Sequence, residues 1–395
     1  MPIARPDTRA SSSLSTVEAG HLWNWLLRGQ GLSTDTRYAA VADIAHAALG
    51  LHAARLPSPY ATVLARAKTP AVAMTLFEPG VHQQVTTIRC MRKTLHTLPL
   101  GLAAAAHAAT LHYRERDALR QVVNAGLSSR QIERTIELIT ALLRDHGFLG
   151  HREIETRLVT GVVPVTAVRL ALKLAWERGT LTYRNASLGW NQERRTFGLT
   201  TNAHPHLDMT MERRLATVRL IEAYFDRYGP ASIHDAMWWS GLSGTAVVDA
   251  LADIPRPLVA ITAPWSASTL YMYQDRLEQF HHQAAGGAPL SGLNFLAHED
   301  VAFKAYFDTR RRYLAELDER AAFNQIGEVL PTIVVDGHIV GTWSWDARGR
   351  RIACALVRGH TDPSLRAEIR KWATSASAAM RLGHTPRTTR RDPSS

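Results

Sequence analysis

Cysteine is scarce in this sequence, which has only Cys90 and Cys354 among its 395 residues. Two isolated cysteines exclude a disulfide framework and a zinc site built from paired Cys-x-x-Cys motifs. Long apolar runs are absent as well, because even LPLGLAAAAHAATL is shorter than a membrane span and is interrupted by Gly101 and His107. The polar N-terminus has no apolar signal core. We therefore expect a cytoplasmic protein with no membrane partner.

Motifs that bind phosphate cofactors or metals are also missing. The chain contains no Gly-rich phosphate loop, no Walker motif and no dinucleotide fingerprint. Its 18 histidines include the clusters AHPH and FHHQ, but neither has a spaced carboxylate or cysteine that would complete a metal site. The sequence therefore predicts neither a metal nor an organic cofactor.

Acidic residues are outnumbered by basic ones. Lysine and arginine total 46 against 35 aspartates and glutamates, which gives a net charge of +11 with histidine neutral. Such an excess favours an acidic partner, and nucleic acid is the first candidate. The alternative explanation is an arginine-rich composition of the kind that high-GC genomes produce. The chain is also long enough to contain several modules.

The middle of the chain shows a recognisable order of elements. RTIELITALLRDHGFLG is an amphipathic helix that ends at a glycine, HREIETRL is a second helix, and PVTAVRLALKLAWERG is a third. TLTYRNASLGWNQERRTFGLT then supplies two β-rich runs. Helix, helix, helix and hairpin is the order of a winged helix, whose third helix reads DNA. The predicted DNA contacts are Arg169 and Lys173 on that helix, and Arg184, Arg194 and Arg195 on the wing.

The same order recurs on both sides of this module, more loosely upstream. Downstream, Ser232 and Asp235 form a capping box for one helix and Ser243 caps the next. After Leu290 the sequence becomes β-branched and aromatic, with turn signals at 336–337 and 348–349. The predicted fold is mainly α with small β-hairpins, arranged as tandem winged-helix modules and a C-terminal β-rich domain. The expected segments are a disordered N-terminus (1–16), three modules (17–112, 113–205 and 206–285), the β-rich domain (286–380) and a disordered basic tail (381–395).

Five segments carry a family resemblance: LLRGQGL, LGLHAARLPSPY, CMRKTLHTLP, YGPASIHDAMWWSGL and PTIVVDGHIVGTW, in this order along the chain. Together they resemble the AlkZ/YcaQ-type DNA glycosylases, which are winged-helix DNA-binding domain-containing proteins. The resemblance extends over about residues 20 to 375. It implies a C-shaped clamp around double-stranded DNA and monofunctional excision of alkylated or bulky N7-purine adducts, without a lysine Schiff base. It also implies DNA repair, often as self-resistance to a DNA-damaging antibiotic.

One family motif is altered here. The family usually has Gln-aliphatic-Gln or Gln-aliphatic-Asp after Gly-Leu, followed by an acidic residue; this chain has His52, Ala53, Ala54 and then Arg55. N7-alkylation already makes the purine a good leaving group, so the protein needs chiefly to hold a water. A neutral imidazole, with an unperturbed pKa of about 6.5, can orient water and accept its proton. We therefore predict that His52 is catalytic and that Arg55 lines the site. The alternative is that His52 merely ends a helix.

A second segment of the predicted site is MRKTLHTLP. If it forms one strand, Arg92, Thr94 and His96 point to the same side. His96 matches a family histidine and is predicted to bind a phosphate or sugar near the lesion, with a core histidine as the alternative. Arg92 and Lys93 are predicted phosphate contacts, with a solvated strand edge as the alternative.

The C-terminal part contributes further candidates. Asp300 matches an aspartate of a family FDPYL segment, and its carboxylate could face a cationic intermediate; a helix cap or a local ion pair is the alternative. Arg310 and Arg311 are predicted phosphate contacts. Trp238 and Trp239 are both expected in the core.

Two other function classes remain open from the sequence. A transcription regulator built on winged helices would pair as a dimer on a two-fold site; no dimerisation helix is apparent, so we expect a monomer. The other is a protein that sequesters a free genotoxin.

Overall fold

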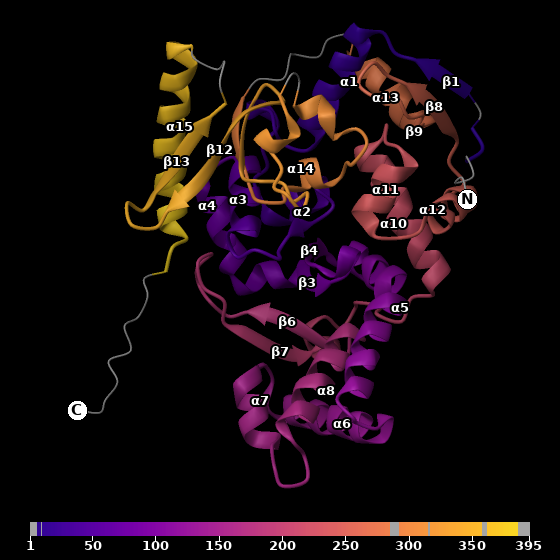
Figure 1. Ribbon diagram of the computed structural model, residues 1–395, viewed down its shortest axis with the longest axis vertical. Coiled ribbons are helices and arrows are strands. Elements are labelled where there is room, and N and C mark those ends of the chain that lie inside the picture. The colour runs from indigo at the N-terminus through magenta and orange to yellow at the C-terminus, as the bar shows by residue number, and fades with distance from the viewer. Residues whose placement is uncertain (1–5, 9, 285–291, 315–316, 358–361, 386–395) are drawn as a thin grey trace.

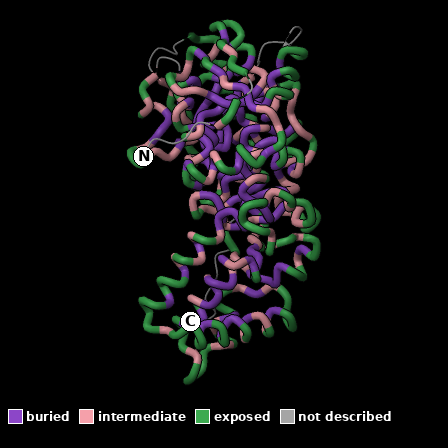
Figure 2. Tube along the Cα trace, turned by 90° about the vertical axis from the view of Figure 1, so that its right-hand side faces the viewer, coloured by how far each residue is buried: buried purple, intermediate pink, exposed green. Residues whose placement is uncertain are grey.

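The computed structural model describes residues 6–8, 10–284, 292–314, 317–357 and 362–385 (Figure 1). Within these ranges the chain is mostly helical, and its strands form three sheets. Buried segments run through the whole length of the molecule (Figure 2). One apolar core joins distant parts of the sequence, including Trp23, Leu98, Tyr224 and Phe303. None of the helices in the described ranges combines the length and apolar content needed to cross a membrane.

The middle of the chain folds in the predicted order. The first helix begins with a capping box at Ser128 and ends at Gly147, which adopts a φ of 71°. A short strand follows and pairs with the last strand of the hairpin, so the sheet order is β5-β7-β6. The elements are α6 (Ser129–His146), β5 (Leu149–Gly150), α7 (His151–Leu158), α8 (Val165–Glu177), β6 (Leu181–Asn185) and β7 (Arg195–Leu199).

Two other units repeat this order. In the first unit the short strand again pairs with the last hairpin strand, giving β2-β4-β3. In the third unit an isolated bridge between Ala231 and Tyr271 takes the place of the short strand. The predicted capping box at Ser232 and the cap at Ser243 are both confirmed. The first unit comprises α2 (Val41–Ala47), β2 (Leu51–His52), α3 (Pro57–Arg66), α4 (Pro70–Met74), β3 (Val85–Arg89) and β4 (Leu95–Pro99). The third comprises α10 (Arg213–Tyr228), α11 (Ile233–Ser240), α12 (Gly244–Asp253), β8 (Leu258–Thr262) and β9 (Leu270–Tyr273).

The first and second units share one sheet. Pairing of Thr87 with Tyr183 joins β3 to β6, so the six strands run β2-β4-β3-β6-β7-β5. The predicted division between 112 and 113 falls inside a single continuous helix, α5 (Leu100–Asn124). The first and second units are therefore joined by a shared sheet and by a continuous helix. The connecting helices elsewhere are α1 (Thr16–Gly29), α9 (Thr200–Ala203) and α13 (Gln274–Ala284).

The N-terminal segment departs from the prediction of disorder over residues 1–16. β1 (Ala10–Ser13) pairs in parallel with β8, from Ala10 opposite Val259 to Ser13 opposite Thr262. Residues 10–13 are ordered because the edge of β8 supplies hydrogen-bond partners that this segment lacks on its own. Residues 1–5 and 9 lie outside the described ranges.

The C-terminal part contains a four-stranded sheet, against which the last helix of the described chain packs. Asp300 caps a single helical turn, and the chain leaves the helix after Lys304. The elements are β10 (Leu293–Leu296), α14 (Val301–Lys304), β11 (Thr332–Val335), β12 (His338–Asp346), β13 (Arg351–Leu356) and α15 (Pro363–Leu382).

The predicted wing between β6 and β7 packs against the end of α15. Trp190 is 5% exposed, and its indole Nε1 donates to Met380 O at 2.7 Å. Beyond α15, the backbone N–H of Thr385 donates to the side chain of Asn191 at 2.9 Å. Residues 381–385 are thus ordered, which corrects the prediction of a disordered tail for that part; residues 386–395 lie outside the described ranges.

Candidate active site

His52 lies on a two-residue strand between two helices, not at a helix end. The turn before it depends on Gly50, whose φ is 104° and where a Cβ would lie 2.3 Å from Leu98 Cδ2. Only glycine fits such a close approach at a positive φ. The strand then places His52 directly opposite His96 on β4. Pro57 starts α3 soon afterwards and fixes the length of the connection.

The two histidine rings contact each other in the interior. Their centroids are 5.2 Å apart at an interplanar angle of 81°, and His52 is 3% exposed. His96 Nδ1 lies 3.2 Å from Thr94 O, which assigns the proton of a neutral imidazole to Nδ1. Neither ring nitrogen of His52 has a hydrogen-bond partner among the described residues. A neutral imidazole in that position has one donor and one acceptor to offer to a water or a substrate.

Burial keeps both imidazoles neutral. It lowers the pKa of His52 to about 2, with His96 and Lys304 acting in the same direction. It lowers the pKa of His96 to about 4. The pKa of His52 thus lies far below the unperturbed imidazole value of about 6.5, because removing the ring from water disfavours its charged form. At neutral pH His52 can orient a water, but it is a poor proton acceptor.

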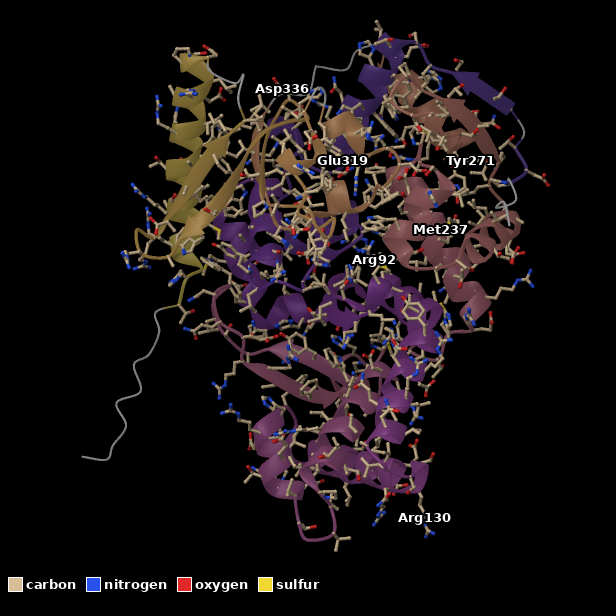
Figure 3. All side chains as sticks on the ribbon, in the orientation of Figure 1. Arg92, Arg130, Met237, Tyr271, Glu319 and Asp336 are labelled. Atoms are coloured by element: carbon tan, nitrogen blue, oxygen red, sulfur yellow. The ribbon has the colours of Figure 1, made fainter. Side chains whose placement is uncertain are left out.

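The segment after β3 is a tight turn and not the expected continuous strand. Arg92 and Lys93 have φ values of 52° and 61°, and β4 begins only at Leu95. The guanidinium carbon of Arg92 lies 3.6 Å from the centroid of the Trp238 ring, and Nη1 donates to Trp238 O at 3.3 Å. Arg92 thus lies between the first unit and α11, near Met237 (Figure 3). Trp238 is half-buried at this site, whereas Trp239 is in the core as expected.

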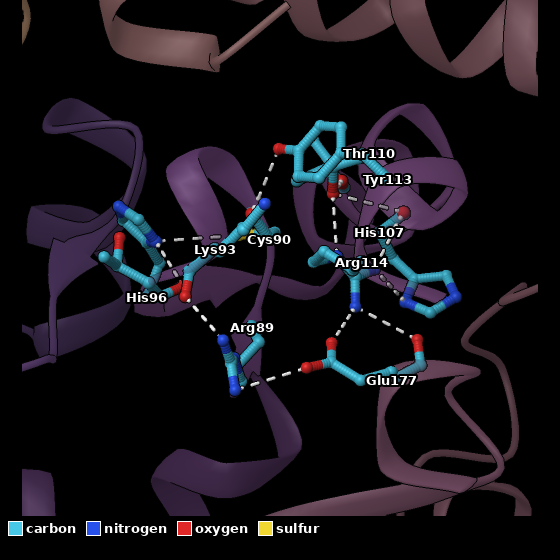
Figure 4. A network of polar contacts seen from close by, with 11 residues as sticks. Arg89, Cys90, Lys93, His96, His107, Thr110, Tyr113, Arg114 and Glu177 are labelled. Carbon is cyan, nitrogen blue, oxygen red and sulfur yellow. Dashed lines mark hydrogen bonds and ion pairs between the residues drawn. The ribbon is translucent and has the colours of Figure 1, made fainter. Parts of the chain in front are cut away.

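An ion-pair network supports this turn (Figure 4). Arg89 Nη2 donates to Lys93 O at 2.9 Å, and its Nη1 lies 3.2 Å from Glu177 at the end of α8. Glu177 is buried and also pairs with Arg114 at 2.6 Å. Lys93 forms an ion pair with Asp117. The network connects the turn of the first unit to the third helix of the second, so the position of Arg92 depends on both units.

The C-terminal part brings charged groups to the same place. Lys304 forms an ion pair with the buried Glu299 and lies 5.5 Å from the Trp238 ring centroid. Burial and the nearby Arg92 lower the pKa of Lys304 to about 7, while Glu328 acts in the opposite direction. His298 Nε2 and Arg55 Nη2 lie 3.5 Å and 3.4 Å from Glu328 Oε2. We refer to His52, Arg92, His96, Trp238, His298, Glu299, Lys304 and Glu328 together as the histidine cluster.

The carboxylate of Glu328 is ionised despite partial burial. Burial raises its pKa, but a hydrogen bond from Asn324 and the nearby His298 and Arg55 lower it below the usual value. Arg55 is thus at the rim, with a side chain that is 58% exposed. The cluster combines neutral imidazoles with charged groups of both signs, an arrangement that can orient a water and stabilise charge that develops beside it.

Asp300 does not line this site. Its side chain is fully buried, and its two oxygens accept hydrogen bonds from Arg66 at 2.7 and 2.9 Å. One oxygen also accepts from the backbone of Ala302 as a helix cap. The structure therefore supports the alternative of a cap and ion pair, because a buried guanidinium requires a carboxylate beside it. The neighbouring Glu299 faces the cluster instead.

The remaining predicted DNA contacts are spread over several surfaces. Arg169 pairs with Glu155 at 2.8 Å, and Lys173 donates to Gln121 at 2.7 Å. The guanidinium of Arg184 lies over Phe148 at 4.2 Å. None of these three interactions involves a member of the histidine cluster. Of the others, Arg195 pairs with Glu193, Arg194 is exposed, and Arg310 and Arg311 both pair with Glu319.

Sequence reasoning missed five members of the cluster: Trp238, His298, Glu299, Lys304 and Glu328. Two of them, His298 and Glu299, directly precede the candidate Asp300 in the sequence. No local pattern marks the others, because they approach His52 only through the packing of the C-terminal part against the first unit. No group of three or more His, Cys, Asp or Glu side chains within the described ranges could hold a metal ion.

Comparisons with known proteins can be set beside this geometry. A family model described as DNA glycosylase AlkZ-like matches residues 45–382. Among solved structures, the chain is similar to the Streptomyces sahachiroi DNA glycosylase AlkZ, with a TM-score of 0.70. The two are 19% identical, over 92% of this chain and 97% of that one, which shows a shared fold. No curated protein gives a match to the sequence.

Proposed function

This chain belongs to the AlkZ-like DNA glycosylase family, as its five ordered segments predicted, and from this premise we propose that it excises N7-alkylated or bulky purine adducts from duplex DNA. In this proposal it acts as a monomeric, monofunctional N-glycosylase. The lesion carries a positive charge that weakens the glycosidic bond. The protein then has to place a water at the sugar and stabilise positive charge that develops there.

The observation that carries the proposal is that both ring nitrogens of His52 lack a hydrogen-bond partner among the residues that the structure describes. They lie opposite His96, within a cluster that holds Arg92 and Lys304. We assign His52 to orienting the water, in the place of the first family glutamine; a glutamine side chain likewise orients a water without taking its proton. Ala54 replaces the second polar residue and leaves room for a larger adduct. Because His52 is closed off from solvent, side chains of the cluster have to move when DNA binds.

We assign the three repeated units to winged-helix modules of a C-shaped clamp on the duplex. Support comes from their common order, in which a short first strand or bridge pairs with the last strand of each hairpin. The helix before the hairpin enters the major groove in such modules. In the second unit this is α8, where we assign Arg169 and Lys173 to phosphate contacts. Arg92 lies nearest the proposed lesion site.

The test is single-turnover base release from duplexes that carry 7-methylguanine or a bulky N7-guanine adduct. Wild type is compared with His52→Ala, His52→Gln and His46→Ala, the last being a control because His46 is exposed on α2. We expect release by wild type and His46→Ala, a loss of about 100-fold or more in His52→Ala, and recovery in His52→Gln. Tight duplex binding without release above the spontaneous rate would contradict the proposal and leave a non-catalytic lesion binder or regulator.

The pH dependence of release separates water orientation from proton acceptance. With its pKa lowered to about 2, His52 stays neutral between about pH 5.5 and 8, so the pH profile of release should have the same shape in wild type and His52→Gln. A rate that rises through about pH 6.5 and loses this rise in His52→Gln would instead make His52 a general base.

A further inference from the structure

An apolar pocket that is partly open to solvent lies between α3, the C-terminal sheet and α15. Its volume is about 250 Å³, and none of its lining residues belongs to the cluster. The walls are mainly apolar and aromatic, with Leu64 on α3, Phe295 and Trp343 on the sheet, and Trp372 and Met380 on α15. The volume is just below the roughly 300–1,000 Å³ of pockets for drug-sized ligands, so it suits a molecule of one or two rings.

One charged group lines this cavity without a carboxylate partner. Arg37 makes no ion pair within the described ranges, and its Nε is buried without a hydrogen-bond partner there. Its Nη2 donates to Asn294 Oδ1 at 3.3 Å, and its guanidinium lies 5.2 Å from the Trp372 ring centroid. Asn294 is itself fixed by donating to Leu32 O at 2.8 Å. Burial and, to a lesser degree, the nearby Arg66 lower the pKa of Arg37.

Among the residues that the structure describes, Arg66 differs from Arg37 in having a carboxylate partner. Arg66 is the neighbouring buried arginine, and the chain supplies Asp300 for it in a two-pronged ion pair. For Arg37 the described part of the chain supplies a neutral amide, Asn294. None of the described residues around the cavity is acidic, and the other cation at its edge is Lys68. A half-buried guanidinium without a carboxylate beside it is stabilised by an anion that fits its planar fork, and a carboxylate fits best.

We propose that this cavity binds a small planar aromatic carboxylate. The carboxylate contacts Arg37, and the ring lies among Trp343, Phe295 and Trp372, where offset and edge-on ring contacts are favourable. The charge of the cavity excludes cationic ligands, and its walls disfavour small hydrophilic anions such as free phosphate. The proposal stands independently of the glycosylase proposal, since it uses none of the same side chains.

A matched ligand pair tests the proposal on the wild-type protein. Binding of 2-naphthoate and of 2-naphthamide is measured by calorimetry and by the change in tryptophan fluorescence. The two probes share their rings and shape but differ in charge. We expect naphthoate to bind at least tenfold more tightly than naphthamide. Equal affinities, or no binding of naphthoate at millimolar concentration, would overturn the proposal.

Variants then locate the site. Arg37→Met keeps the length of the side chain and removes its charge, so it should abolish the preference for naphthoate; Arg348→Met, an exposed arginine at the β12–β13 turn, should retain it. Thermal unfolding checks that both variants are folded. If Arg37→Met does not fold, the ligand pair on wild type still decides. Displacement of naphthoate by undamaged duplex would place Arg37 in a DNA surface and would also overturn the proposal.

Discussion

The Arg66–Asp300 ion pair stabilises the core. Its removal should lower the free energy of unfolding without changing the base-release step itself. Both side chains are fully buried, and Asp300→Asn leaves the guanidinium uncompensated. We expect the free energy of unfolding to fall by about 3–5 kcal/mol, measured by urea denaturation. Asp253→Asn is the control, since its partner Arg214 is 77% exposed and such a pair contributes less than about 1 kcal/mol. Equal losses in the two variants would contradict this assignment.

The buried histidines should make the protein sensitive to mild acid. Burial lowers the pKa of His52 to about 2, of His107 to about 3 and of His96 to about 4. In the unfolded chain these three imidazoles bind protons below about pH 6.5, whereas in the folded protein they stay neutral down to about pH 4. The unfolded state therefore binds more protons in this window, and stability is lost as the pH falls through it. Each histidine contributes up to about 1.4 kcal/mol per pH unit.

The measurement is the urea midpoint at about pH 7.5 and pH 5. Carboxylates with lowered pKa values respond mainly below about pH 4.5, so the loss between these two points reports the histidines. A His107→Gln variant should show a smaller difference between the two midpoints. Identical midpoints for wild type would show that the histidines are accessible to protons in the folded state.

At the scale of single elements, the wing of the second unit is held by the C-terminal helix. Trp190 is buried against Met380, so Trp190→Ala should lower the free energy of unfolding by about 3–5 kcal/mol. Leu188 in the same hairpin is 72% exposed, and Leu188→Ala should change stability little. Hydrogen exchange of β6 and β7 should accelerate in the tryptophan variant alone. Slow exchange in both variants would show that the wing holds its position without the indole.

Elements with local signals could be predicted from the sequence. The capping box at Ser232 and the glycine that ends α6 depend on only a few neighbouring residues, and both predictions are confirmed. The pairing of β1 with β8 and the shared sheet of the first two units were not predicted, because they join segments whose contact depends on the whole fold. The candidate site divides in the same way. His52 and His96 were found from motifs, whereas Lys304 and Glu328 reach them only by tertiary packing.

For the whole molecule, the net charge of +11 predicts DNA binding that weakens steeply with salt. The logarithm of the affinity should fall with the logarithm of salt concentration by about 0.9 per phosphate neutralised. Fluorescence anisotropy with a labelled undamaged duplex measures this slope. Arg194 is exposed and makes no ion pair within the described ranges, so Arg194→Ala should reduce the slope by about 1. Arg311→Ala is the comparison, because Arg311 is paired with Glu319 and should change the slope less. An unchanged slope in Arg194→Ala would remove that residue from the DNA surface.

The sheet shared by the first two units fixes the angle between them. The Thr87–Tyr183 pairing, the continuous α5 and the ion pairs at Glu177 all act across this junction. Under the proposed function, a duplex that contacts both units meets two surfaces whose relative orientation is set before DNA binds. Where that orientation requires a bend, bending a site of 20–30 base pairs by 40–90° costs about 1–6 kcal/mol, and this cost depends on the local stiffness of the DNA. Flexible base steps would then be favoured before any base is touched, and the mechanics of the double helix would become part of how the proposed substrate is selected.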